Sequence, residues 1–247
     1  MKKHLLFVAA LMVAATMYAK DDLLIVEEGS PTFWTETGKL ATIAIDWSST
    51  SVVEWDGKHR VEKDFGTIDQ YNRKQGEDFV RDWPTLQESI THSFTSSANY
   101  TNKKKGLKII SPSSPIMIAS LENMTDEQKE AIKKDWAKQE QNKLAPVYYR
   151  DYSEAAYDIF IKVDTVDMGN AAASAFAGAA NPYAGGADIV GSMVVKDHAT
   201  QEVVCKMHLN HVKGRGSYSQ AGRLSGIAYR LWGDAMPKLI KDISKKK

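Results

Sequence analysis

Two histidines near the C-terminal end of the chain have the spacing of a metal site. His208 and His211 form an H-x-x-H pair, which on a helix would place two imidazoles on one face. The segment around them alternates apolar and polar residues, as in a half-buried strand. Positions three apart on a strand point to opposite faces, so we expect His211 in line with the apolar set and His208 outside. The sequence therefore predicts no metal site.

The single cysteine, Cys205, lies in the apolar row of the same strand, between Val203 and Met207. A nucleophilic thiol needs an electropositive, partly exposed setting. We therefore predict that Cys205 is a small buried side chain and not a nucleophile. One cysteine cannot form an intramolecular disulfide, so stability must come from a packed core.

Two pairs of carboxylates could serve a hydrolase, Asp164 with Asp167 and Glu27 with Glu28. Acid and base catalysis requires two groups that face one substrate. Residues three apart at the end of a strand diverge instead. The sequence also contains no nucleophile elbow, Walker loop or H-E-x-x-H motif. We therefore predict no catalytic residues and no cofactor.

Residues 168–187 contain no charged side chain over 20 positions, although 26% of the chain is charged. The run lacks the glycine order and the lysine of a nucleotide loop, and its asparagines, proline and glycines disfavour a transmembrane helix. We predict a small-residue connection between two strands, in which Asn170 caps a short helix that Pro182 ends. Its only aromatic residues, Phe176 and Tyr183, are the candidate contact residues, because uncovered apolar surface usually meets a partner.

The strands and helices expected around these residues indicate an α+β fold. Alternating apolar residues indicate strands at 23–26, 40–47, on both sides of Asp56-Gly57, at 106–111, 157–166, 187–197 and 202–212. Helical periodicity indicates amphipathic helices at 76–99, starting at Gly76 or Asp82, and at 220–244, with a kink at Gly233 and Pro237.

We therefore expect a mixed, mostly antiparallel sheet packed by two amphipathic helices, one in the first half and one at the C-terminus. A polar helix at 125–144 has only a thin apolar stripe, so it is either a surface insertion or a partner-binding arm. This helical insertion spans about 112–146, within a single domain of residues 20–247.

The N-terminal residues 1–19 have the three parts of a secretory signal peptide: basic residues, a short apolar stretch and small residues. Cleavage is expected after Ala15 or Ala19. Neither choice leaves a cysteine for lipidation, so we predict a periplasmic or secreted protein with no transmembrane span in the mature chain. Removal of Lys2 and Lys3 from the 32 basic residues leaves 30, against 31 acidic ones, and this balance disfavours nucleic acid as a partner.

The order of elements resembles a group of bacterial envelope domains that includes the N-terminal domain of TolB and the curli secretion channel subunit. Tyr157, Asp158, Ile159 and Ile161 are similar to a strand motif of this group. Asp197, Thr200, Val203 and Val204 are similar to its hairpin turn, although Gln201 stands where the group has glycine. The resemblance implies an α/β domain with binding or assembly roles and no catalysis.

The leading hypothesis is a non-catalytic envelope protein that acts through protein contacts, with another envelope protein or with itself, as an assembly or export accessory. Peripheral membrane contact is left open. One rival is a hydrolase with a site assembled from His208, Asp188 and Asp197. Another is a glycan- or ligand-binding module that uses the aromatic residues Trp55, Trp34 and Tyr148.

Overall fold

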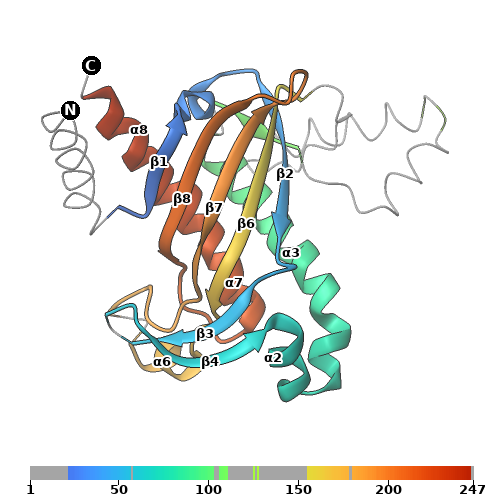
Figure 1. Cartoon of the computed structure of the whole chain (residues 1–247), viewed down its shortest axis with the longest axis vertical. Coiled ribbons are helices and arrows are strands. Elements are labelled where there is room, and N and C mark those ends of the chain that lie inside the picture. The colour runs from blue at the N-terminus through green and yellow to red at the C-terminus, as the bar shows by residue number, and fades with distance from the viewer. Residues whose placement is uncertain are drawn as a thin grey trace, which may run out of the picture.

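The computed structural model describes residues 22–56, 58–102, 106–110, 125, 127, 155–177 and 180–245 (Figure 1). The predicted signal peptide and nearly all of the predicted insertion lie outside these residues. The described helices and strands are β1 (Leu24–Gly29), η1 (Pro31–Thr35), β2 (Leu40–Asp46), β3 (Ser51–Trp55), β4 (Val61–Thr67), α2 (Ile68–Gln75), α3 (Glu77–Thr101), β5 (Lys108–Ile109), β6 (Tyr157–Asp167), α6 (Ala171–Ala177), β7 (Asp188–Asp197), β8 (Val203–Lys213), α7 (Gln220–Tyr229), η3 (Arg230–Ala235) and α8 (Met236–Ser244).

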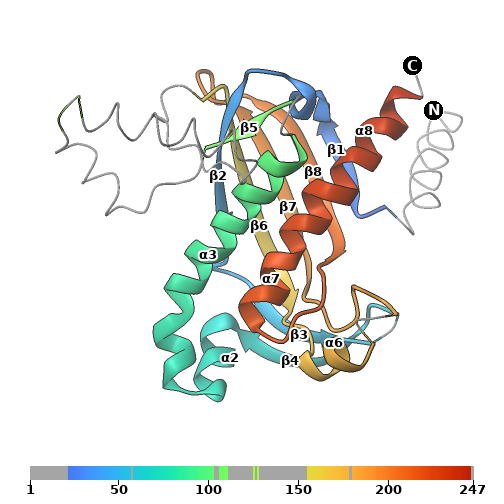
Figure 2. The same cartoon turned by 180° about the vertical axis from the view of Figure 1, so that it is seen from behind.

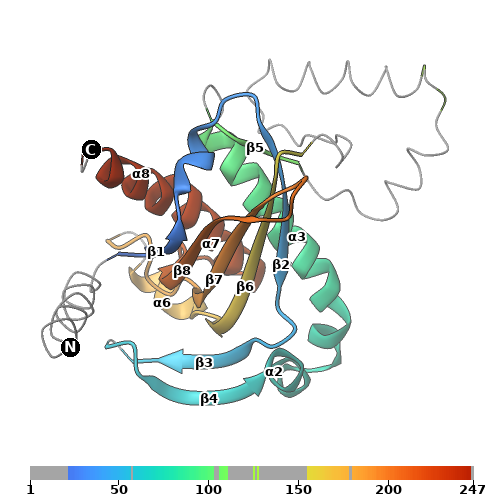
Figure 3. The same cartoon turned by 45° about the horizontal axis from the view of Figure 1, so that its top comes forward.

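The strands form one mixed sheet in the order β1-β8-β7-β6-β2-β5. The β1-β8-β7-β6 pairs are antiparallel, whereas β2 runs parallel to β5 and β6. At its far end β6 also pairs in parallel with β3, which with β4 forms a hairpin at the lower end of the molecule (Figure 3). The predicted α+β class with a mostly antiparallel sheet is confirmed.

Helices α3, α7 and α8 cover one face of the sheet (Figure 2). The inward side chains of β6, β7 and β8 alternate with outward ones, as the sequence predicts for strands with one buried face. Against them pack Ile90 and Phe94 of α3 and Leu224, Ile227 and Leu231 of the C-terminal helical segment, all buried. Trp232 stacks on Trp34 with ring centroids 4.7 Å apart, which joins the end of the chain to its beginning.

The predicted C-terminal helix is present without a break as three consecutive helical segments, α7, η3 and α8. Its middle, η3, is a π-helix that contains Gly233, and Pro237 follows at the start of α8. A π-turn widens the helix by one residue, and this one includes Gly233, one of the two positions at which the sequence predicts a kink. Gly226 of α7 lies close to the backbone of Arg215, in the loop after β8, where a Cβ atom would come within 2.7 Å of the Arg215 nitrogen.

The first-half helix, α3, begins at Glu77 with Gly76 as its N-cap, so of the two predicted starts Asp82 is wrong. Pro84 lies within α3, and Glu77 and Asp78 occupy its first turn. Before it the structure contains α2, which the sequence analysis did not predict. Thr67 and Gln70 form a capping box at the start of α2, with the Thr67 hydroxyl accepting from the Gln70 amide.

Candidate functional site

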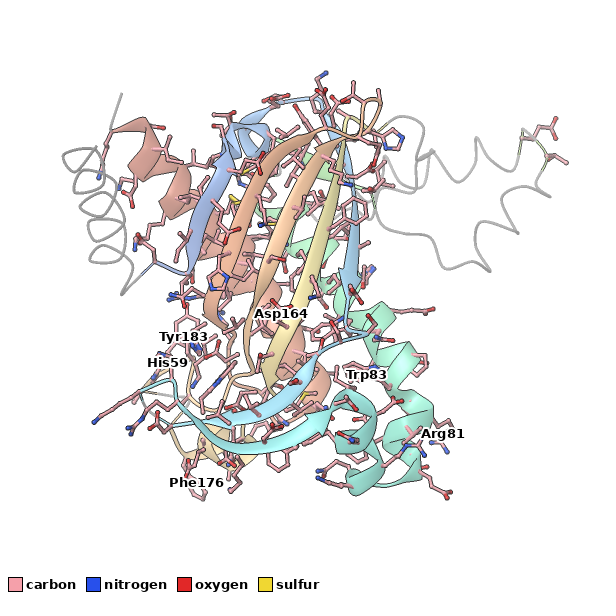
Figure 4. All side chains as sticks on the ribbon, viewed as in Figure 1. His59, Arg81, Trp83, Asp164, Phe176 and Tyr183 are labelled. Carbon is pink, nitrogen blue, oxygen red and sulfur yellow. The ribbon has the colours of Figure 1, made fainter. Side chains whose placement is uncertain are left out.

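The described residues of the run without charged side chains, 168–177 and 180–187, lie at the lower end of the molecule (Figure 4). As predicted, Asn170 caps a short helix, α6: its Oδ1 accepts from the amides of Ala172 and Ala173. The prediction that Pro182 ends this helix is wrong, because the described helix ends at Ala177 and residue 180 already lies in a turn. The Ser174 hydroxyl then donates to the carbonyl oxygens of Asn170 and Ala184, which ties the helix to the return of the loop. The loop is therefore held by its own hydrogen bonds.

The backbone at Gly185 requires a residue without a side chain. Its φ is +66°, and a Cβ atom there would lie 2.1 Å from the Asn170 carbonyl oxygen and 2.5 Å from the Ser174 nitrogen. Both the left-handed backbone and the close approach exclude a larger residue.

Tyr183 fastens the loop to the C-terminal π-helix. Its hydroxyl donates to Asp234 Oδ2 at 2.7 Å, and the Arg230 guanidinium, which bonds to the same oxygen at 2.9 Å, lies 4.4 Å from the Tyr183 ring centre. Burial and the hydrogen bond to Asp234 raise the pKa of Tyr183. The side chain of Tyr183 therefore makes contacts within the chain.

The side chain of Phe176, unlike that of Tyr183, is exposed to solvent. It is 91% exposed, the most of any large hydrophobic side chain in the described ranges, and Tyr218 follows with 79%. The segment that carries Tyr218 packs on the same loop, because Gly216 N donates to the Pro182 carbonyl at 2.8 Å and a Cβ atom on Gly216 would lie 2.8 Å from the Ser174 hydroxyl. Two exposed aromatic rings are thus carried by two loops that are bonded together.

A second cluster lies at the other end of β6. Asp158 is 7% exposed. Its Oδ1 accepts a hydrogen bond from the Thr42 hydroxyl at 2.6 Å and lies 2.9 Å from His198 Nδ1, and its Oδ2 accepts from Gln201 Nε2 at 2.9 Å. Burial alone would raise the pKa of Asp158, but the bonds from Thr42, His198 and Gln201 together lower it. The cluster joins β2, β6 and the β7–β8 turn.

Gln201 has a left-handed backbone, with φ +60°. The envelope domains that the sequence resembles have glycine at this position, and glycine adopts that conformation without strain. Here the Gln201 side chain makes two hydrogen bonds, to Asp158 Oδ2 and to the His198 carbonyl, which offset the backbone strain.

The residues of the hydrolase alternative do not come together. Asp188 and Asp197 are the first and last residues of β7, about 30 Å apart along a strand of this length. His208 lies between them, opposite Ser192. A site built from these three residues is excluded.

Three of the other four carboxylates that the sequence singled out, Asp164, Asp167 and Glu27, have structural partners. Asp164 is paired with Lys162 at 2.9 Å and Glu27 with Lys206 at 2.9 Å, both on the exposed side. Asp167 accepts from the amides of Gly169 and Trp55.

Cys205 is fully buried, as predicted, and burial raises the pKa of its thiol to about 11. A thiol with such a pKa holds its proton at neutral pH, which agrees with a packing role.

Trp34 is buried at 3% exposure, so it cannot face a glycan as the ligand-binding alternative required. Trp55 packs edge-on against His211, with ring centroids 4.6 Å apart. Tyr148 lies outside the described residues.

A groove of about 470 Å³ lies between α2, α3 and the start of α7. Trp83, Leu86 and Phe79 line it, and the edge of Trp83 meets Trp47 at 5.9 Å between ring centroids. The Asn72 side chain, 2% exposed, also lines the groove, and both its amide nitrogen and oxygen lack a hydrogen-bond partner. An unpaired buried amide is costly, so this groove offers a ligand two unused hydrogen-bonding atoms.

Comparison with solved structures gives weak likenesses, among them two PelC dodecamers. A PelC dodecamer from Paraburkholderia phytofirmans is 10% identical with a TM-score of 0.30, covering 85% of this chain and 96% of that chain. A variant PelC dodecamer from the same organism is 11% identical with a TM-score of 0.32, covering 85% and 95%. Similarities with TM-scores this low do not establish a shared fold or function. No family model and no curated protein matches the chain, and the resemblance to the TolB group stays a prediction from sequence motifs.

Proposed function

We propose that this is a non-catalytic protein of the bacterial cell envelope, periplasmic or secreted, that acts by associating with further copies of itself. The contact surface is the aromatic end, which we define as Phe176 and Tyr218 with the loops that carry them. The envelope location rests on the signal-peptide pattern at residues 1–19.

The observation that carries the proposal is the exposure of Phe176 on an anchored loop. A single exposed apolar residue is ordinary on a protein surface. Here two aromatic rings with exposures of 91% and 79% lie on loops joined by a backbone hydrogen bond, and Tyr183 fixes one of these loops to the C-terminal helix. Preorganised aromatic residues lose little conformational entropy on binding, which is why they dominate interface energetics.

Sedimentation velocity over a concentration series tests the proposal. The mature protein should sediment as an oligomer, and Phe176→Ser should shift it to the monomer. Tyr100→Ser is the matched control, because Tyr100 is an aromatic side chain of α3, 55% exposed, near the other end of the molecule. A strictly monomeric mature protein, or equal effects of the two substitutions, would refute self-association through this end.

A second candidate function is the binding of a small apolar molecule in the groove beside α3, and the unpaired Asn72 amide favours it. A fluorescent naphthalene sulfonate should bind there and lose affinity in Asn72→Leu and Trp83→Ala, but not in Tyr100→Ser. Unchanged affinity in the first two variants would remove this candidate.

A further inference from the structure

Three side chains from distant parts of the sequence meet where the β3–β4 hairpin reaches the end of the sheet. They are His59 of the hairpin turn, Asp188 at the start of β7 and His211 near the end of β8. One potential ligand atom from each lies within 4.8 Å of the other two. The imidazole rings of His59 and His211 are 3.8 Å apart between centroids, and His211 Nδ1 is 3.3 Å from Asp188 Oδ2.

His211 reaches this place because β8 is irregular there. The β7–β8 register shifts between Ile189 and Gly191, which are opposite Val212 and Leu209, so β8 has an extra residue. His211 has φ +49°, and Val212 takes the inward position after it. The prediction that His211 continues the apolar row is therefore wrong, because a β-bulge interrupts the alternation.

His59 is held in place by the turn that carries it. Asp56 Oδ1 accepts from the amides of Lys58 and Arg60, and the His59 amide donates to the Asp56 carbonyl at 3.0 Å. His59 also has a left-handed backbone, with φ +60°. Two of the three non-glycine residues with positive φ in the described chain thus belong to one cluster, and such strain often accompanies functional sites.

Asp188 supplies the independent sign of a missing ligand. It is 4% exposed, and its Oδ1 is buried with no hydrogen-bond partner. A buried carboxylate oxygen without a partner costs more than an ordinary unmade hydrogen bond. A cation between this carboxylate and the two imidazoles would remove that cost.

We propose that His59, Asp188 and His211 bind a divalent transition metal ion of the Zn²⁺ class. Two imidazoles and one carboxylate are ligands that Zn²⁺ takes in three-ligand sites with an open position. With metal-ligand bonds of about 2.1 Å in a tetrahedral site, two ligand atoms lie about 3.4 Å apart. The present separations, which are within 4.8 Å, therefore need to close by at most about 1.4 Å, a distance that side-chain rotation can supply. His59 is exposed, which gives an ion a path to the site.

The proposed metal site does not depend on self-association. Its ligands also differ from the H-x-x-H pair of the sequence, because His208 is not one of them. His208 lies at mid-strand opposite Ser192, whereas the partners of His211 are Asp188 of β7 and His59 of the β3–β4 turn. No local spacing in the sequence signals the cluster.

Isothermal titration of chelator-treated, tag-free mature protein with Zn²⁺ tests the site. We expect one ion per chain, with affinity reduced about tenfold or more in His59→Asn and in Asp188→Asn. Asparagine adopts the left-handed conformation readily, so His59→Asn preserves the turn. His208→Asn is the control and should bind within about twofold of the natural protein.

Thermal unfolding separates a lost site from a lost fold. Zn²⁺ should raise the melting temperature of the natural protein and of His208→Asn but not of His59→Asn. Absence of Zn²⁺ binding by the natural protein, or equal binding by a folded His59→Asn variant, would overturn the proposal.

Discussion

Asp158 shows at the scale of one residue how a polar group is placed inside this fold. Its carboxylate is nearly buried and bonded to Thr42 of β2 and to His198 and Gln201 of the β7–β8 turn. Sequence reasoning identified Asp158 only as part of a strand motif. Its partners lie 116, 40 and 43 positions away, and no local pattern predicts such contacts.

The lowered pKa of Asp158 predicts a pH dependence of stability. A carboxylate with a depressed folded pKa contributes stability that is present above its unfolded pKa, near 4, and is lost as the pH falls through the folded pKa. Asp158→Asn should therefore lower the free energy of unfolding by about 1–3 kcal/mol at pH 7, with a smaller loss below pH 4.

Urea unfolding at several pH values measures this difference. Asp164→Asn is the control on the same strand, because its ion pair with Lys162 is exposed and should change stability by less than about 1 kcal/mol. Equal effects of the two substitutions at pH 7 would contradict the role given to Asp158.

The strained backbone at Gln201 gives a second prediction. Gln201→Ala removes the side-chain bonds and keeps the strain at φ +60°, whereas Gln201→Gly removes both. The glycine variant should be more stable than the alanine variant by about 1 kcal/mol in denaturant unfolding. An alanine variant as stable as the glycine variant would show that the turn carries no such strain.

At the scale of elements, the sequence predicted well what depends on local periodicity. The strands of the second half, the β3–β4 hairpin and the two amphipathic helices follow from alternation or helical spacing. Helix α2 was missed because it has only eight residues, although the Thr67 and Gln70 capping pattern was readable. The parallel pairing of β3 with the far end of β6 depends on contacts distant in sequence, which periodicity does not encode.

The anchored loop around α6 makes its own prediction. Gly185→Ala should lower the free energy of unfolding by more than about 2 kcal/mol, because it combines a left-handed backbone with a steric clash against Asn170 and Ser174. Gly233→Ala is the matched control, since the nearest atoms to a Cβ there are 3.7 Å away. Thermal or denaturant unfolding of both variants decides the matter, and similar stabilities would contradict the packing described for this loop.

At the scale of the whole molecule, one helical layer covers one face of the sheet, and its two ends carry different chemistry. The Asp158 cluster lies at one end of β6, and the aromatic end and the His59 cluster lie at the other (Figure 4). None of the described helices has the length and apolarity needed to cross a membrane.

The predicted envelope location has a direct test. Expression of the full chain in a Gram-negative cell should yield a product in the periplasm or medium whose N-terminus follows Ala15 or Ala19. N-terminal sequencing and cell fractionation measure this. An uncleaved chain that stays in the cytoplasm would contradict the signal-peptide prediction.

Self-association through the aromatic end is the central claim, and photo-crosslinking in intact cells tests it most directly. A photoreactive amino acid at position 176 should give a crosslinked species of twice the monomer mass that contains only this chain, whereas the same amino acid at position 100 should not. A position-176 variant that is folded, exported and gives no crosslink to a second copy would contradict the account.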